Sequence, residues 1–237
     1  MSFETWERVY CGPAPDPAEI WLRWNLDPIL LLALGALALA IGRTRPGALA
    51  VAVLALAFVS PLCALSASLF SARVVHHILL VVAAAPLIAL AWPARKPQAA
   101  AISFLVSTAV LWAWHLPPAY DLALSWVPAY WAMQVSLIAT AVVFWRAVLH
   151  PHQSGGPALL LILGGYMQMA LLGALLTFAP ASLYAIHAVA PLDWGLSPLR
   201  DQQLGGLLMW VPAGLPYLAW GAMVAQRGWR ALEGRPG

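Results

Sequence analysis

The chain has 237 residues, of which 62% are hydrophobic and only 9% are charged. This balance excludes a soluble globular domain, which needs a solvated face, and it predicts an integral membrane protein surrounded by a lipid bilayer. The formal net charge of +3 is too small to indicate binding of a nucleic acid.

Seven apolar stretches, bounded by charges, proline or glycine, are candidates for membrane-spanning helices. The first is the shortest, and we expect Asp27 to cap it and Pro28 to occupy its first turn. The pattern predicts an all-α fold, a polytopic membrane protein with seven transmembrane helices in one bundle. The predicted spans are residues 28–42, 48–70, 72–92, 99–116, 128–149, 158–179 and 204–226.

The orientation of the bundle follows from its lysines and arginines, which gather on the cytoplasmic side of membrane proteins. We therefore expect the N-terminus outside and the C-terminus in the cytoplasm, with an extracytoplasmic segment (1–27), a transmembrane domain (28–226) and a cytoplasmic tail (227–237). The cations on the predicted inner side are Arg43, Arg45, Arg95, Lys96, Arg146, Arg227, Arg230 and Arg235, whereas the outer side has Arg8, Arg23, Arg73 and Arg200 with eight of the nine acidic residues.

Four of the six histidines fall at predicted outer ends of the helices. His76 and His77 open the third span, His115 closes the fourth, and His187 lies in the outer loop before the seventh. Adjacent residues of a helix point about 100° apart. We therefore expect only one of the paired histidines to face an inward site, and we favour His77.

Soft sulfur ligands lie near the same end, above all Met209 in the first turns of the seventh span. Imidazole with thioether suits copper, especially Cu(I), whereas hard cations prefer the clustered carboxylates that this sequence lacks. We therefore predict a copper site. Packing is the simpler interpretation for the other methionines, including Met133, Met167 and Met169.

Simpler interpretations also apply to other polar groups. A histidine at a helix end often only bonds a loop carbonyl or meets lipid headgroups, although burial in the membrane would favour a function. His150 and His152 lie in a glycine- and proline-rich inner loop that reads as a solvated turn. Cys11 and Cys63 show no metal-type spacing and need not pair.

Asp201 precedes the apolar onset of the seventh span. It can be the cap or a first-turn acid of that helix, where the helix dipole favours a negative charge. It can also orient a ligand imidazole as a supporting carboxylate. Both roles can hold together.

Four stretches resemble the CtaG-like cytochrome c oxidase assembly family, which are seven-helix bacterial membrane proteins. They are "WNLDPILLLALGALALAIG" in the first span, "SARVVHHILLVVAAAPLIAL" in the third, "WAWHLPPAYDLAL" in the fourth and "LRDQQLGGLLMWVPAG" at the seventh. The resemblance implies a protein of the bacterial inner membrane, without catalytic activity, that acts in the maturation of haem-copper oxidases. The implied partners are an oxidase subunit and a periplasmic copper donor.

The family's histidine pattern carries over onto His77, His115 and the run Asp201 to Gln203, followed by Met209. Relatives usually have a further histidine where this chain has Arg73, and often another where it has Gln134 and Val135. His76 and His187 are candidates to replace them. The predicted metal site therefore comprises His77, His115, His76, His187, Met209 and Asp201.

Three functions remain open at this stage. The first is an assembly factor that binds copper at its periplasmic face and delivers it to the copper B centre of an oxidase. The second is a copper transporter or a membrane enzyme, although the sequence shows few ionisable groups within the second, fourth and fifth spans. The third is a metal-free scaffold that holds an oxidase subunit during assembly.

Overall fold

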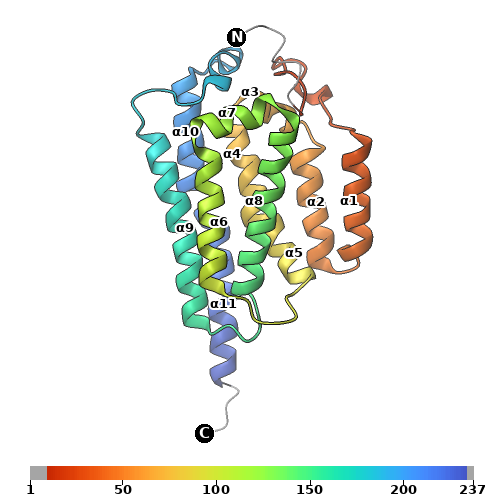
Figure 1. Cartoon of the computed structure of the whole chain (residues 1–237), viewed down its shortest axis with the longest axis vertical. Coiled ribbons are helices and arrows are strands. Elements are labelled where there is room, and N and C mark those ends of the chain that lie inside the picture. Colours follow the sequence, from red (N-terminus) through yellow and green to blue (C-terminus); the bar gives the residue numbers. More distant parts are fainter. Residues whose placement is uncertain (1–9, 234–237) are drawn as a thin grey trace.

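The structure is a computed structural model that describes residues 10–233, and within this range the chain contains helices and no strand. Most helices run side by side along the long axis of the molecule (Figure 1). This confirms the all-α prediction. Residues 1–9 and 234–237 of the predicted terminal segments lie outside the described range.

The helices include α-helices, short 3₁₀ turns and one π-helical segment. In chain order they are η2 (Ile20–Leu22), α1 (Pro28–Ile41), α2 (Arg45–Phe58), α3 (Leu62–Ser68), α4 (Phe70–Ile78), the π-helix η3 (Leu79–Ala84), α5 (Ala85–Ala91), α6 (Ala100–His115), α7 (Pro117–Ser125), α8 (Val127–Val148), α9 (Gly155–Thr177), η4 (Ala185–His187), η5 (Ala190–Trp194), α10 (Pro198–Trp210) and α11 (Gly214–Glu233).

Several helices are long and apolar enough to cross a membrane. Phe70–Ala91, Val127–Val148, Gly155–Thr177 and Pro198–Arg230 qualify individually, and two bent pairs raise the number of candidate spans to six. The chain is thus a multi-pass membrane protein. The first predicted span, residues 28–42, corresponds to α1, which is apolar but too short to qualify, so the count of seven and the orientation stay predictions.

Local sequence explains where the helices start and bend. The Asp27 carboxylate accepts a hydrogen bond from the Ile29 N–H at 2.8 Å, with Pro28 in the first turn, as the sequence predicts. α6 and α7 meet at an angle of 75° because Pro117 forces the preceding Leu116 into an extended conformation. As a result, α7 lies across the end of the bundle (Figure 1).

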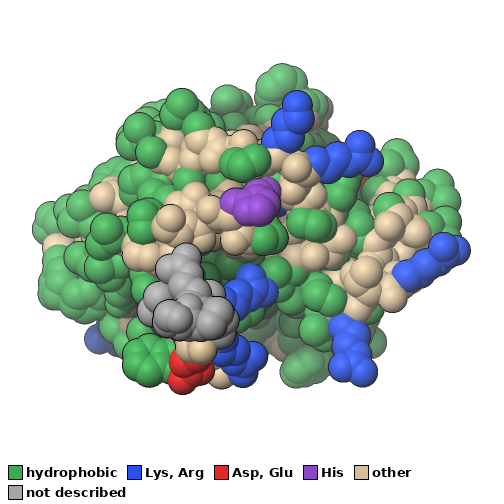
Figure 2. All heavy atoms as spheres, turned by 90° about the horizontal axis from the view of Figure 1, so that it is seen from below, with side chains coloured by type: hydrophobic (Ala, Val, Ile, Leu, Met, Phe, Trp, Pro, Cys, Tyr) green, Lys and Arg blue, Asp and Glu red, His purple; other side chains and the backbone are tan. Residues whose placement is uncertain are grey.

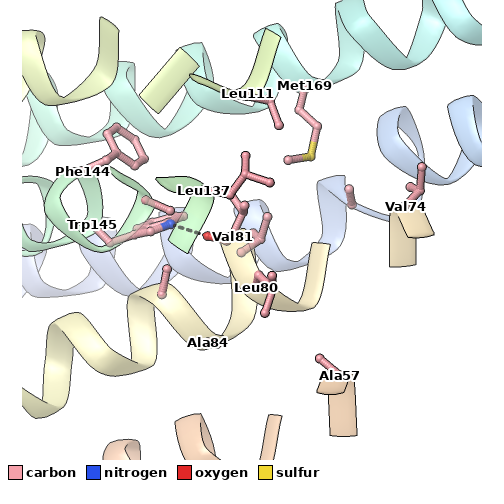
Figure 3. Close-up of a cluster of buried hydrophobic side chains, with 14 of the residues drawn as sticks. Ala57, Val74, Leu80, Val81, Ala84, Leu111, Leu137, Phe144, Trp145 and Met169 are labelled. Carbon is pink, nitrogen blue, oxygen red and sulfur yellow. Dashed lines mark hydrogen bonds between the residues drawn. The ribbon is translucent and has the colours of Figure 1, made fainter. Parts of the chain in front are cut away.

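The histidine-bearing helix widens into a π-helix after Ile78, the residue that follows His77, and this segment spans Leu79–Ala84. Two tryptophans reach its backbone. The indole N–H of Trp145 donates to the Val81 carbonyl at 2.8 Å, which Figure 3 shows, and that of Trp220 donates to the Val82 carbonyl at 2.9 Å. A π-helical turn disturbs the regular hydrogen-bond ladder. These indoles therefore fix the segment against α8 and α11.

A disulfide bond joins Cys11 to Cys63, whose Cα atoms are 5.4 Å apart. It ties the chain before α1 to α3 at the end of the bundle that holds the four outer histidines. The sequence leaves the pairing of these cysteines open, because their sequence separation is 52 residues and only the folded chain brings them together.

Candidate functional site

Glycines allow α10 to lie unusually close to its two neighbours. A Cβ atom on Gly206 would be 2.5 Å from the Gly173 carbonyl oxygen of α9, and one on Gly205 would be 2.5 Å from the Phe70 ring of α4. Only residues without side chains fit such crossings. This packing places Met209 of α10 next to both α4 and α9.

Asp201 fixes the start of α4, although it belongs to α10. Its carboxylate accepts hydrogen bonds from the N–H groups of Phe70 and Ser71 at 2.6 and 3.1 Å, and from the Ser71 hydroxyl at 2.5 Å. The first turn of a helix has N–H groups without intrahelical partners. Asp201 is therefore a first-turn acid of α10, as predicted, but the helix that it caps is α4. Ser197 caps α10 itself.

The loop between α9 and α10 is held by two further polar side chains. The Asp121 carboxylate accepts hydrogen bonds from the N–H groups of Ala185 and Ile186, at 3.2 and 3.3 Å. The Gln202 side-chain oxygen accepts one from the Leu183 N–H at 2.7 Å. Asp121 and Asp201 thus both accept hydrogen bonds from backbone N–H groups of other segments.

His187 is locked by both of its ring nitrogens. Nδ1 lies 3.2 Å from the Ser68 carbonyl oxygen, which can only accept, so Nδ1 carries the proton and Nε2 accepts from the Tyr120 hydroxyl at 2.9 Å. Burial, together with the positive charge of Arg73, lowers the pKa of His187 to about 3. The ring is neutral at physiological pH and has no lone pair left for a metal.

His77, His115, Met169 and Met209 surround one small cavity, closed by the apolar side chains of Val74, Ile78, Val81 and Leu111. Figure 3 shows the Met169 side chain beside Leu111. The cavity measures about 10 Å³, near the lower limit for holding one water molecule. It fits a single ion and excludes a larger substrate.

One of the two imidazoles of this cavity, that of His115, is arranged as metal ligands usually are. The Nδ1 of His115 donates to the Leu111 carbonyl oxygen at 2.7 Å, which leaves the lone pair of Nε2 free. Both ring nitrogens of His77 are buried and have no hydrogen-bond partner among the described residues. The two ring centroids are 6.1 Å apart.

The remaining paired histidine, His76, is directed elsewhere. Its ring packs edge-on against Phe58 with centroids 4.8 Å apart, and it does not line the cavity. The structure thus separates the two adjacent histidines and places His77, the one favoured from the sequence, beside His115. Of the six predicted site residues, it brings together His77, His115 and Met209.

Met169 is the cavity residue that sequence reasoning assigned to packing. It lies one turn before Gly173 on α9, and residues four apart share a helix face. Gly173 contacts α10 beside Met209, so Met169 faces α10 as well. The spacing of Met169 and Gly173 could therefore have identified Met169 as a cavity residue, but only once the crossing of α9 and α10 is known.

Arg73 and Gln134 occupy the two positions where this chain lacks histidines that are usual in the family it resembles. Both are fully buried, and their polar side-chain atoms have no hydrogen-bond partner among the described residues. The Arg73 guanidinium lies over the Tyr130 ring at 5.3 Å from its centroid. A buried cation therefore stands one helical turn from His77.

Residues 10–233 contain no group of three or more His, Cys, Asp or Glu side chains that could hold a metal ion. A site made of carboxylates, thiolates or imidazoles alone is thus not present in the described chain. The His and Met cavity is of another kind, because two of its four donors are thioethers.

The fold and this cavity define a class: a multi-pass helical membrane protein with a small, buried cluster of imidazole and thioether groups at one end. The profile of the cytochrome c oxidase caa3 assembly factor family (Caa3_CtaG) matches residues 96–231. This is more than half of the chain, which therefore belongs to that family. No curated protein and no solved structure matches it.

The matched region contains α6 to α10 and nearly all of α11, and with them His115, Met169 and Met209. His77 lies before the matched region, on α4, within the stretch "SARVVHHILLVVAAAPLIAL" that resembles the family. Membership in an assembly factor family gives the chain a role in cytochrome c oxidase assembly, which implies an oxidase partner and a membrane setting.

Proposed function

We propose that this protein binds one copper ion, as Cu(I), between His77, His115, Met169 and Met209, and helps to deliver it to the copper B centre of a haem-copper oxidase. The protein holds the ion as cargo and catalyses no reaction. It receives the copper from a donor on the periplasmic side of the bacterial inner membrane and transfers it by exchange of ligands.

The convergence of two imidazoles and two thioethers on one ion-sized cavity carries this proposal. Neutral nitrogen and soft sulfur donors favour Cu(I) over the harder divalent ions. In a membrane, polar groups buried without partners are costly, which makes a function the default interpretation of the free nitrogens of His77.

Two observations support the orientation in this proposal, with the cavity toward the periplasm. The disulfide Cys11–Cys63 lies at the same end of the bundle, and disulfides persist in oxidising compartments. Lysines and arginines gather at the opposite end, which Figure 2 shows from below. Positive charge is typical of cytoplasmic loops.

The test is copper stoichiometry on the full chain, purified in detergent and loaded anaerobically with Cu(I). We expect about one copper per chain in the wild type and none in the variant His77→Ala/His115→Ala. The matched control, His150→Ala/His152→Ala, removes the same number of imidazoles at the other end and should keep its copper. X-ray absorption of the loaded protein should show sulfur scatterers at copper, which Met169→Leu/Met209→Leu removes.

Equal copper in all variants would place the ion elsewhere and refute this site. Absence of copper from the wild type would favour the second candidate, a metal-free scaffold for an oxidase subunit. One observation supports that candidate: the buried cation of Arg73 beside the cavity opposes the binding of another cation.

A further inference from the structure

A second cavity opens at the opposite end of the bundle, between the α8–α9 loop and α11. Its volume is about 490 Å³, and its polar lining includes His150, His152, Ser154 and Arg227. None of the lining residues, all of which the structure describes, carries a carboxylate. The cavity thus has a mixed polar and apolar lining, and its only formal charge is positive.

The start of α9 supplies hydrogen-bond donors to this cavity. Ser154 precedes the helix without capping it through its side chain, and the N–H groups of Gly155 and Gly156 form no hydrogen bond within the described chain. The next residue, Pro157, has no N–H. Free N–H groups at the start of a long helix attract anions, because the helix dipole is positive there.

His150 provides an independent indication of a ligand. Its side chain is only 9% exposed, and its Nδ1 accepts a hydrogen bond from the His152 N–H at 3.2 Å. An accepting Nδ1 places the proton of the neutral ring on Nε2. Among the described residues, Nε2 has no hydrogen-bond partner, and it is not one of the buried side-chain atoms without a partner, so it is open to solvent. A mostly buried residue of the cavity lining therefore has a donor that a ligand can reach.

Arg227 completes the set from α11. It is exposed and lines the same cavity, and the Gly155 and Gly228 backbones lie close enough that α9 and α11 form its two sides. Figure 2 shows histidine near the middle of this face, with lysine and arginine side chains around it and a single acidic patch. The surrounding field is therefore positive.

We propose that this cavity binds a phosphate group through the Arg227 guanidinium, the Nε2–H of His150 and the free N–H groups at the start of α9. A guanidinium pairs with two phosphate oxygens at once, and the N–H groups can donate to the others. The same chemistry fits the headgroup of an anionic phospholipid and free inorganic phosphate. The site is separate from the metal cavity and is independent of the function proposed above.

The experiment measures binding of radiolabelled inorganic phosphate to the full chain in a neutral detergent by equilibrium dialysis. Arg227→Gln should weaken binding about tenfold, the size expected for a lost charge-assisted contact. The matched control is Arg230→Gln, which removes the same charge from the same helix but not from the cavity lining. It should change binding by less than about twofold, because exposed charges are screened.

The histidine is tested by a pair of replacements. His150→Asn keeps an acceptor for the His152 N–H but loses the Nε2 donor, so it should weaken phosphate binding. His150→Gln places an amide donor near the Nε2 position and should restore it. Thermal unfolding of each variant confirms that the fold is kept.

A second arm identifies the source of the phosphate. The wild type and both arginine variants are placed in nanodiscs of phosphatidylglycerol and phosphatidylcholine, and retained lipid is measured by native mass spectrometry. Retention of phosphatidylglycerol that depends on Arg227 assigns a lipid headgroup; saturable phosphate binding without such retention assigns the free anion. Equal effects of Arg227→Gln and Arg230→Gln in both arms, or no binding in either, would overturn the proposal. Copper is not a readout, so this result does not depend on the metal site.

Discussion

The two ends of the bundle bury polar groups in different ways. At the histidine end, polar side chains reach across from one helix to another: Asp201 of α10 caps α4, and Asp121 of α7 holds the loop after α9. At the other end, most of these contacts are local, as where Thr44 caps its own helix α2 through the Gly47 N–H, and the Arg146 guanidinium makes a long-range contact to the Pro93 carbonyl.

This difference separates a rigid end from an adaptable one. Long-range hydrogen bonds and a disulfide hold the histidine end in one arrangement, which a small ion site requires because ligands must be placed to within a fraction of an ångström. The opposite end leaves donors free around an open cavity, which suits a larger and hydrated ligand. The following predictions test this contrast, from the largest expected effect to the smallest.

The strongest test of the rigid end is Asp201→Ala. It leaves the N–H groups of Phe70 and Ser71 buried and unpaired, and it removes three hydrogen bonds to a charged acceptor. We expect the free energy of unfolding to fall by about 4 kcal/mol. Unfolding of the purified protein in mixed detergent, followed by circular dichroism, measures this loss.

The control for this prediction is Asp201→Asn, which keeps one acceptor oxygen and should lose about half as much stability. If Asp201→Ala lowers the free energy of unfolding no more than Asp201→Asn does, the carboxylate does not hold α4, and the rigidity of this end must have another origin.

Removing the disulfide is the next test. The double variant Cys11→Ser/Cys63→Ser opens a covalent loop that spans a sequence separation of 52 residues, and we expect a loss of about 3 kcal/mol. The midpoint of thermal unfolding should fall in the variant, and in the wild type when reductant is added. Reductant should not change the variant. Equal midpoints for both proteins would show that the bond contributes nothing to this end.

The disulfide also shows what a sequence of this kind can and cannot predict. Hydrophobic runs placed the helices, and Asp27 with Pro28 marked the start of α1, because these signals act within a few neighbouring residues. The pairing of Cys11 with Cys63 depends on how the segment before α1 folds back over α3, and no local pattern encodes that path.

In the candidate site, too, the features that local sequence determines could be predicted, whereas those that depend on contacts between helices could not. Helical geometry was enough to expect that His76 and His77 point apart and to place His115 at the same end. The roles of Asp201 and Met169 needed the crossings of α10 with α4 and α9, which glycines permit but do not specify. His187 was predicted as a ligand because a sequence cannot show that Ser68 and Tyr120 occupy both of its nitrogens.

The pH dependence of stability gives a third test, of about 2 kcal/mol. The pKa of His187 is lowered to about 3 in the folded chain, so the unfolded chain binds more protons below its ordinary pKa of 6.5. Its contribution to stability is complete above pH 6.5 and is lost as the pH falls toward 3. Between pH 7 and pH 5, we expect the wild type to lose about 2 kcal/mol more than His187→Gln.

The exposed His152 at the other end serves as the control for this measurement. The variant His152→Gln should follow the wild type over the same pH range, because its ring is not locked between buried partners. A wild type whose stability falls no more steeply than that of His187→Gln would show that burial at the histidine end does not suppress protonation.

The smallest effect concerns the charge of Arg73, and the other end supplies its matched control. The guanidinium carbons of Arg73 and Arg146 lie at 5.3 and 5.4 Å from the centres of the Tyr130 and Trp92 rings, but only Arg73 is fully buried beside the metal cavity. Replacing Arg73 by Met removes a positive charge that opposes a bound cation, so the affinity for Cu(I), measured by chelator competition, should rise by roughly tenfold. Arg146→Met should leave it unchanged.

An equal or lower affinity in Arg73→Met would mean that the charge is compensated when the ion binds. Copper binding by Arg73→Met but not by the wild type would identify Arg73 as the residue that keeps this chain metal-free, and it would favour the scaffold function.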